Sequence, residues 1–290
     1  MLKKLLLGVS SLVCIVLFAQ DAAYPDKGEL SLQAGAYQVR IAAQRAYTIS
    51  GFEYQSFPLL AKGGANGSIL TLSDRSMMIG GSNTSEQICK LILRVDGTEQ
   101  PISTTLFSGN DIVLEKESLI GGFRFFTTLN LTAEGLTCKV RFNYEKEQEL
   151  NYFYIFVLGW HTDMTDFLYS GKDEPVAGTL KSDGNWLFNA KIPWFALYQK
   201  QSGFGTVTAI SNNIPLVQRR ISLWDHKFYK KNYIFHKIPD FQKEKESAEY
   251  VFCIGAFQAS EETWQATAKA AASSLQSKLP EAETAANVAK

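Results

Sequence analysis

The feature that most constrains the fold of this chain is an alternation of apolar and polar residues with a period of two, which recurs from Gly28 until about residue 260. It is clearest in "FRFFTTLNLTAEGLTCKVRFNY", residues 123–144. Successive side chains of an extended strand point to opposite faces, so this stretch predicts an antiparallel hairpin with one buried and one solvated face. We expect alternate residues from Phe123 to Leu131 and from Leu136 to Tyr144 to face the core.

Other segments carry β-favouring patterns as well, among them "LNYFYIFVLGW", "WFALYQ", "TVTAIS" and "AEYVFCIGAF". "LNYFYIFVLGW" is apolar on both faces, which predicts a central strand covered on both sides. No period lasts between residues 161 and 193, and we expect a long loop there, of the kind that carries function more often than structure. Only "SEETWQATAKAAASSLQ" predicts a helix, capped by Ser260 with Glu261 and Glu262 in its first turn, and ending before Pro280.

These patterns define the expected fold class as all-β, a large antiparallel β-sandwich of the supersandwich type with one C-terminal helix. About fifteen to twenty strands would fit, which is too many for a seven-stranded immunoglobulin sandwich. No linker with a shift in composition and no internal repeat divides the chain. We therefore expect one domain over residues 24–279, followed by a loose tail over residues 280–290.

Residues 1–19 have the character of a secretory signal peptide, because Lys3 and Lys4 precede an apolar run from Leu5 to Phe18. That run is shorter than the roughly 20 residues that a membrane-spanning helix requires. We expect cleavage before Gln20 and a secreted or periplasmic protein. A retained anchor is the alternative.

The chain has 29 basic and 29 acidic residues, and loss of residues 1–19 would remove two lysines and no acid. This balance gives no electrostatic reason to expect nucleic acid as a partner, and no second apolar stretch predicts an integral membrane span after signal cleavage. Cys89, Cys138 and Cys253 each fall inside a strand-like run, which predicts buried free thiols. Since no cysteine or histidine spacing is typical of zinc or haem, we expect no metal and no cofactor.

Several elements in their order along the chain resemble one known architecture. They are "GAYQVRIAAQRAYTISGFEYQSFPLL", a glycine-rich segment, the hairpin closed by "TAEGL", the segment "PWFALYQKQSGFGTVTAI", and the late aromatic segment "LWDHKFYKKNYIFHKI". Together they resemble the galactose-mutarotase-like β-supersandwich over residues 28–257. The resemblance implies a concave sheet face that holds a saccharide. In true epimerases of this type it also implies two histidines and a glutamate, where one histidine protonates the ring oxygen and the glutamate deprotonates the anomeric hydroxyl.

His161, Asp163 and His226 are the candidate catalytic residues. His161 and Asp163 follow the end of an apolar strand, and a carboxylate beside a histidine can fix its tautomer for general acid–base catalysis. A solvated loop is the alternative. If residues 223–238 form one unbroken strand, Trp224 and His226 face one way and Tyr229, Lys231 and Tyr233 the other. His226 and His236 then lie about 33 Å apart, and only a turn near Asn232 would bring them together.

Trp186, Trp194 and Trp224 are candidate binding residues, because a flat aromatic ring stacks on the apolar C–H face of a pyranose. Tyr198 and Arg219 are candidates for the same surface, since a lyase would need a basic tyrosine and a cation beside a uronate. The residues favour a carbohydrate-binding protein. An aldose-1-epimerase-like or polysaccharide-lyase-like enzyme and a structural interaction protein of the cell envelope are the alternatives.

Overall fold

The computed structural model of the chain describes residues 24–64, 66–72, 78–81, 85–146, 150–211, 219–236 and 246–280. Five of these are described without their side chains, namely Leu72, Leu150, Arg219, Phe235 and His236. The predicted signal peptide, residues 1–19, lies outside the described residues, as does the predicted tail beyond residue 280.

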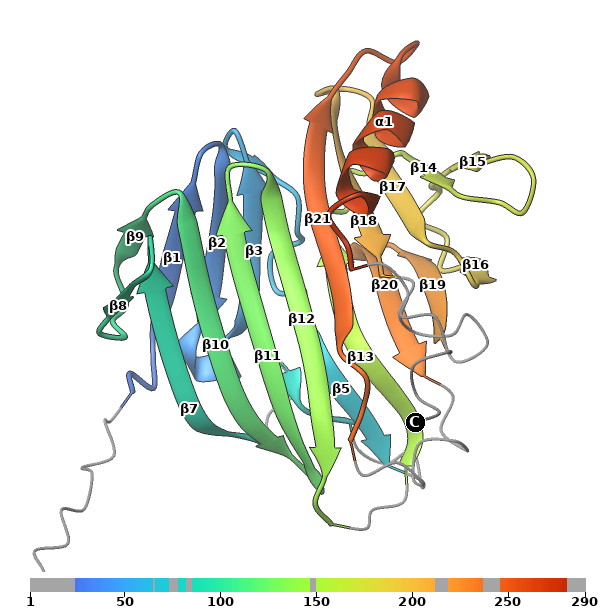
Figure 1. Cartoon of the computed structure of the whole chain (residues 1–290). Coiled ribbons are helices and arrows are strands. Elements are labelled where there is room, and N and C mark those ends of the chain that lie inside the picture. The colour runs from blue at the N-terminus through green and yellow to red at the C-terminus, as the bar shows by residue number, and fades with distance from the viewer. Residues whose placement is uncertain are drawn as a thin grey trace, which may run out of the picture.

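The described residues form three sheets and one α-helix (Figure 1). The ten-stranded sheet has the order β15 (Val176–Thr179), β14 (Asp166–Tyr169), β17 (Trp194–Gln199), β18 (Phe204–Ile210), β21 (Tyr250–Gln258), β12 (Gly135–Tyr144), β11 (Phe123–Thr132), β10 (Asp111–Ile120), β7 (Glu86–Val95), β8 (Thr98–Gln100). The six-stranded sheet has the order β16 (Trp186–Ala190), β19 (Arg219–His226), β20 (Tyr229–His236), β13 (Leu150–Trp160), β5 (Gly67–Leu72), β6 (Met78–Ile79). The five-stranded sheet has the order β4 (Phe57–Pro58), β3 (Thr48–Tyr54), β2 (Tyr37–Ala42), β1 (Glu29–Ala34), β9 (Leu106–Ser108).

The predicted fold class is confirmed. Neighbouring strands pair antiparallel throughout the described sheets, with the exception of the parallel pair β1 and β9. The described strands number 21, slightly more than the sequence patterns suggest. The hairpin of β11 and β12 has the expected register, with Phe123 opposite Tyr144 and Leu131 opposite Leu136. Its alternate side chains are buried as the period of two requires.

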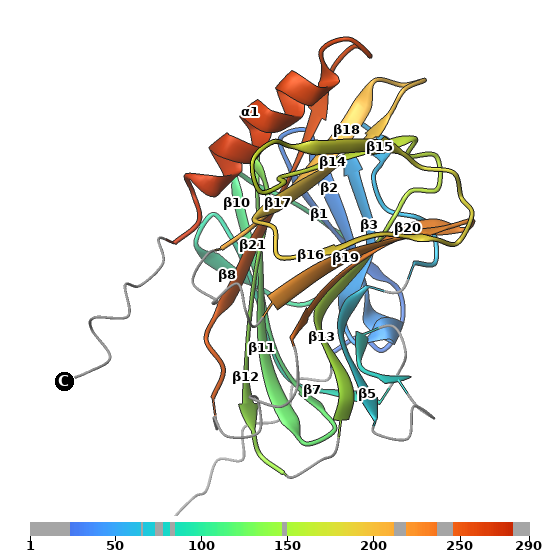
Figure 2. The ribbon, with the colours of Figure 1, turned by 90° about the vertical axis from the view of Figure 1, so that its right-hand side faces the viewer.

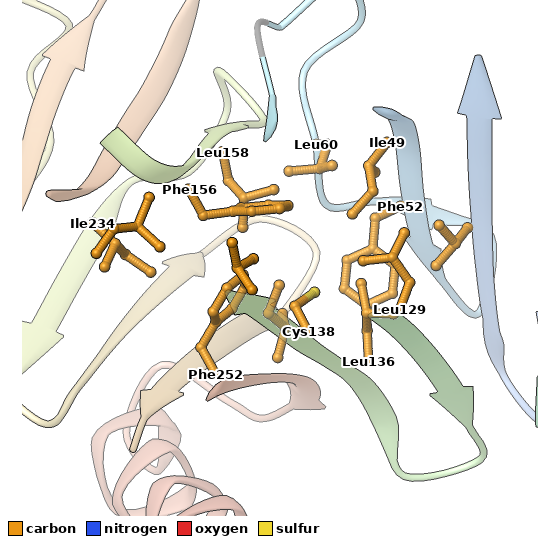
Figure 3. Close-up of a cluster of buried hydrophobic side chains, with 14 of the residues drawn as sticks. Ile49, Phe52, Leu60, Leu129, Leu136, Cys138, Phe156, Leu158, Ile234 and Phe252 are labelled. Atoms are coloured by element: carbon orange, nitrogen blue, oxygen red, sulfur yellow. The ribbon is translucent and has the colours of Figure 1, made fainter. Parts of the chain in front are cut away.

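The main core lies between the ten-stranded sheet and the two smaller sheets. Figure 3 shows part of it, where Phe52 from β3, Leu129 from β11, Phe156 from β13 and Phe252 from β21 lie in one apolar cluster. Burying a side chain of this size stabilises a fold by about 1.5–3 kcal/mol. Strands distant in sequence are therefore held together mainly by this shared apolar layer.

A second core lies on the opposite face of the ten-stranded sheet, beneath α1 (Trp264–Gln276). The helix packs over β17, β18 and β21, as Figures 1 and 2 show. Trp264, Ala268, Ala272 and Leu275 form its buried side, which recurs every three to four residues as the helical period requires. The predicted N-cap is shifted by three residues, because the helix begins after Thr263 and not after Ser260.

Three further expectations are corrected. The predicted loop over residues 161–193 contains the short strands β14, β15 and β16. Strand β13 is covered on both faces only in part, since Tyr152 is 42% exposed. Of the segment 223–238, residues 223–236 are described, and they belong to a hairpin that turns at Lys227 and Phe228, not near Asn232. Asn232 is buried in mid-strand and accepts a hydrogen bond from Trp160 Nε1 at 2.7 Å.

The three described cysteines are all free thiols. Cys138 and Cys253 are buried as predicted. Cys89 is exposed, because its side chain points away from the core on β7. The prediction of burial is therefore wrong for this residue.

Candidate functional site

The hairpin of β19 and β20 gathers aromatic side chains on one face of the six-stranded sheet. Its two-residue turn places His226 opposite Tyr229, Trp224 opposite Lys231, and Ser222 opposite Tyr233. Directly opposed residues in an antiparallel pair project to the same face of the sheet. Tyr229, Lys231 and Tyr233 therefore share a face with Trp224 and His226, whereas counting along one unbroken strand predicts the opposite face.

An aromatic row continues from this hairpin across four strands. Trp186 of β16 stacks on Trp224 with ring centroids 5.8 Å apart and planes inclined by 15°. Its centroid also lies 5.3 Å from that of Tyr233, which is 5.0 Å from that of Tyr154. Tyr154 stacks on Tyr152 at 6.1 Å. These five residues form the aromatic row, which includes two of the tryptophans selected from the sequence.

All residues of the aromatic row except Trp224 line a cleft of about 430 Å³, within the usual range for small-molecule sites. Trp186 on β16 forms one aromatic wall, and Tyr152 and Tyr154 on β13 form the other. Strands β19 and β20 lie between β16 and β13 and so separate the two walls. Trp186 is 56% exposed and has ring surface available for a ligand. The remaining lining residues are Tyr233, Asn189 and Ser222, so hydroxyl and amide groups lie beside the aromatic surfaces. We call this site the aromatic cleft.

A buried ion pair supports the cleft from the inner side of the sheet. Nζ of Lys230 lies 2.5 Å from Oδ1 of Asp225, and it also donates a hydrogen bond to Oγ of Ser182 at 2.6 Å. The other carboxylate oxygen of Asp225 accepts a hydrogen bond from the backbone N–H of Ser182 at 2.9 Å. Trp224 Nε1 donates to the carbonyl oxygen of Gly184 at 2.8 Å. These contacts fix the segment that leads into Trp186.

Burial governs the ionisation of the groups on this face. It lowers the pKa of Lys231 to about 8, because the charged ammonium loses hydration. Its Nζ lies 5.5 Å and 5.3 Å from the ring centroids of Tyr229 and Tyr233, at cation–π distance. Burial raises the pKa of Tyr233 and of Tyr154. Both phenols are therefore protonated at neutral pH and available as hydrogen-bond donors.

The three predicted catalytic residues do not form one constellation. His161 follows β13, where its Nδ1 accepts a hydrogen bond from the backbone N–H of Asp163 at 3.3 Å and lies 3.7 Å from the nearer oxygen of that carboxylate. His226 lies beside Trp224, with ring centroids 4.5 Å apart. It forms no ion pair with a carboxylate of any described residue. His161 and Asp163 are absent from the lining of the aromatic cleft.

Two further predicted binding residues, Trp194 and Tyr198, lie away from the cleft. Trp194 is 7% exposed and Tyr198 is fully buried, both in the second core beneath α1. Tyr198 stacks on Trp264 with centroids 5.0 Å apart and donates a hydrogen bond to the carbonyl of Ala259 at 2.9 Å. This packing leaves neither ring a face for a ligand, so we remove both from the binding surface. Arg219 begins β19, and its side chain lies outside the described set.

Sequence reasoning missed Tyr152, Tyr154 and Tyr233 as site residues. The first two alternate with Phe153 and Ile155, which are fully buried, so the period of two would have placed both tyrosines outward. Tyr233 could be placed only once the position of the hairpin turn was known.

Two features are absent from the described residues. No group of three or more histidine, cysteine, aspartate or glutamate residues within them is placed to hold a metal ion. No helix among them combines the length and apolar character needed to cross a membrane.

The architecture is that of a large β-sandwich, and comparisons relate it to proteins of known structure. No family model and no curated protein matches the sequence. An α-N-acetylgalactosaminidase from Bifidobacterium bifidum is similar with a TM-score of 0.52 and 8% identity, over 83% of this chain and 38% of that one. A putative aldose 1-epimerase from Escherichia coli K12 is similar with a TM-score of 0.47 and 11% identity, over 80% of this chain and 99% of that one.

A galactose mutarotase-like protein from Clostridium acetobutylicum is also similar, with a TM-score of 0.47 and 8% identity, over 79% of this chain and 95% of that one. The structures of similar fold thus include proteins described as galactose mutarotase-like and as an aldose 1-epimerase, the kind of protein that the sequence resembles. At these identities the similarity describes the fold alone.

Proposed function

We propose that this chain is an exported carbohydrate-binding protein that holds a saccharide in the aromatic cleft. The observation that carries the proposal is the placement of the exposed indole of Trp186 and the rings of Tyr152 and Tyr154 around one cleft, with Asn189 and Ser222 beside them. A pyranose presents apolar C–H groups on its face and hydroxyls at its rim. Aromatic walls with a few polar groups complement both parts.

The geometry favours binding over catalysis. Ring opening or proton abstraction requires an acid and a base on opposite sides of one sugar. His161 and Asp163 line no part of the aromatic cleft, and no described carboxylate pairs with His226. The α-N-acetylgalactosaminidase of similar fold is named for a glycoside, which agrees with a saccharide as the ligand class.

The proposal includes export, which rests on the signal-like character of residues 1–19. Cell fractionation of the producing organism, with N-terminal sequencing of the protein recovered outside the cytoplasm, tests this part. We expect Gln20 as the first residue. Recovery of the intact chain from the cytoplasm would contradict it.

A glycan array followed by titration calorimetry tests the binding function. Trp186→Ala should weaken the affinity for the bound glycan about tenfold, because it removes one stacking wall. Phe228→Ala is the matched control. Phe228 is 66% exposed in the turn between β19 and β20, and it does not line the cleft. Equal loss of affinity in both variants, or no glycan bound by the parent protein, would refute the proposal.

A further inference from the structure

A second groove of about 540 Å³ lies where β1, β2 and β3 approach the segment that follows β13. It shares no lining residue with the aromatic cleft. The ionisable side chains of its lining are four basic groups and one carboxylate. The basic groups are Arg40, Arg45, Lys62 and His161, and the carboxylate is that of Glu29. We call it the cationic groove.

Arg40 is held in place within this groove. A Cβ atom on Gly51 would lie 2.5 Å from Nε and 2.7 Å from Nη2 of Arg40, so the guanidinium rests directly against the backbone of Gly51. Nη2 of Arg40 also lies 3.0 Å from Oε1 of Glu53. A guanidinium fixed in this way loses little conformational entropy when it binds a ligand.

Arg45 is presented by a strained turn that is fixed from the interior. Ala46 and Tyr47, which follow it, have φ values of 51° and 54°, in the left-handed region that is unfavourable for residues other than glycine. Nζ of Lys116 donates a hydrogen bond to the carbonyl of Ala46 at 2.9 Å. Lys116 is itself buried and paired with Glu86 at 2.6 Å. The fold therefore maintains this costly turn, which carries Arg45 at the rim of the groove.

Neighbouring acids balance only part of the charge of the groove, through Glu53, which pairs with Arg40, and Glu29. Arg45 and Lys62 form no ion pair with another described residue. Glu29 is the carboxylate of the lining, and one of its oxygens already accepts a hydrogen bond from Oγ of Ser50 at 2.7 Å. Two cations are thus available to an incoming anion.

We propose that the cationic groove is a second binding site, for a ligand that carries a carboxylate or similar oxyanion on a body the size of a monosaccharide. Arginine presents paired N–H groups that match the two oxygens of such a group. The volume falls in the range of small-molecule sites and exceeds what a bare inorganic anion needs. Pro58 and Leu60 add apolar surface for the body of the ligand. This site does not depend on the aromatic cleft.

Titration calorimetry of the whole protein at low ionic strength tests the proposal, with D-glucuronate, D-glucose and inorganic sulfate as probes. We expect glucuronate to bind at least about tenfold more tightly than glucose, because only glucuronate carries a charged group that can accept hydrogen bonds from Arg45 and Lys62. The double variant Arg45→Gln, Lys62→Gln should weaken glucuronate binding about tenfold or more. The matched control Lys90→Gln, Lys269→Gln removes the same charge from exposed positions outside the groove and should leave binding unchanged.

Unchanged glucuronate binding by the Arg45→Gln, Lys62→Gln protein would overturn the proposal, as would equal loss in the control. Sulfate that binds as tightly as glucuronate would overturn the assignment of a sugar-sized ligand. Thermal melting of each variant shows that it is folded. None of the four substituted residues lines the aromatic cleft, so glycan binding at Trp186 can fail or succeed independently of this result.

Discussion

The ammonium of Lys230 and the carboxylate of Asp225 lie 2.5 Å apart as direct cross-strand neighbours, with side chains 1% and 0% exposed. The pair sits on the inner face of the hairpin whose outer face carries Trp224 and His226. Two buried charges remain tolerable because each satisfies the other and both are hydrogen-bonded further. The aromatic cleft therefore rests on an ionic contact inside the sandwich.

Removing one member of this pair should destabilise the protein strongly. Asp225→Ala leaves the Lys230 ammonium buried without its partner, a loss that typically costs about 3–5 kcal/mol in the free energy of unfolding. The double substitution Asp225→Leu, Lys230→Met removes both charges and should cost clearly less than Asp225→Ala alone. Urea denaturation monitored by tryptophan fluorescence measures both. A double variant less stable than the single one would contradict the expectation.

Trp186 and Trp194 should differ sharply in their effect on stability. Trp194→Ala creates a cavity in the second core and should lower the free energy of unfolding by about 3–5 kcal/mol. Trp186 is more than half exposed, so Trp186→Ala should cost about 1 kcal/mol or less. Denaturant titration of the two variants provides the comparison. Equal destabilisation would place Trp186 in the core and remove it from the ligand surface.

Lys231→Met should stabilise the protein at neutral pH and do so less as the pH rises. The pKa of Lys231 is lowered to about 8 in the folded state, against about 10.4 in the unfolded chain. Between these values the unfolded state binds more protons, so the contribution of Lys231 to stability rises with pH, and its full cost is present below pH 8.

The stability difference between Lys231→Met and the parent protein should therefore fall by on the order of 3 kcal/mol from pH 7 to above pH 10. Other titrating groups are common to both proteins and cancel in this difference. Denaturation curves at a series of pH values give the measurement. A difference that is constant with pH would show that Lys231 titrates normally.

The described thiols should react in two classes. Cys89 is exposed, whereas burial raises the pKa of Cys138 and of Cys253 and so disfavours their thiolates. A thiol reagent such as Ellman's should label Cys89 quickly and the other two only after unfolding. Cys89→Ser should abolish the fast phase attributable to it, and persistence of that phase would mean that the interior opens readily.

The parts of the fold that follow from local pattern were predictable from the sequence. The hairpin of residues 123–144 combines a strict period of two with a short polar turn, so each residue indicates its own face. The hairpin of residues 219–236 was not predictable from the sequence, because Lys227 and Phe228 are not typical turn residues whereas Asn232 is. Misplacing that turn assigned Tyr229, Lys231 and Tyr233 to the wrong face.

The candidate site was predictable only in part for a similar reason. Trp186 and Trp224 could be selected by residue type, but their stacking depends on the pairing of β16 with β19, which no local signal specifies. Trp194 is also a tryptophan, but it is covered by α1, a helix that begins more than 60 residues after it in the chain. Whether an aromatic ring is covered or free is a property of the tertiary structure.

The order of strands in the ten-stranded sheet has a consequence for how this chain is made. Its middle position belongs to β21, which joins β12 to β18 and is contributed by residues 250–258. A chain delivered N-terminus first cannot join the two halves of that sheet until residue 258 has emerged. The two halves therefore join late in the synthesis of residues 24–258, and the edges of β12 and β18 stay open to chaperones until β21 pairs with them.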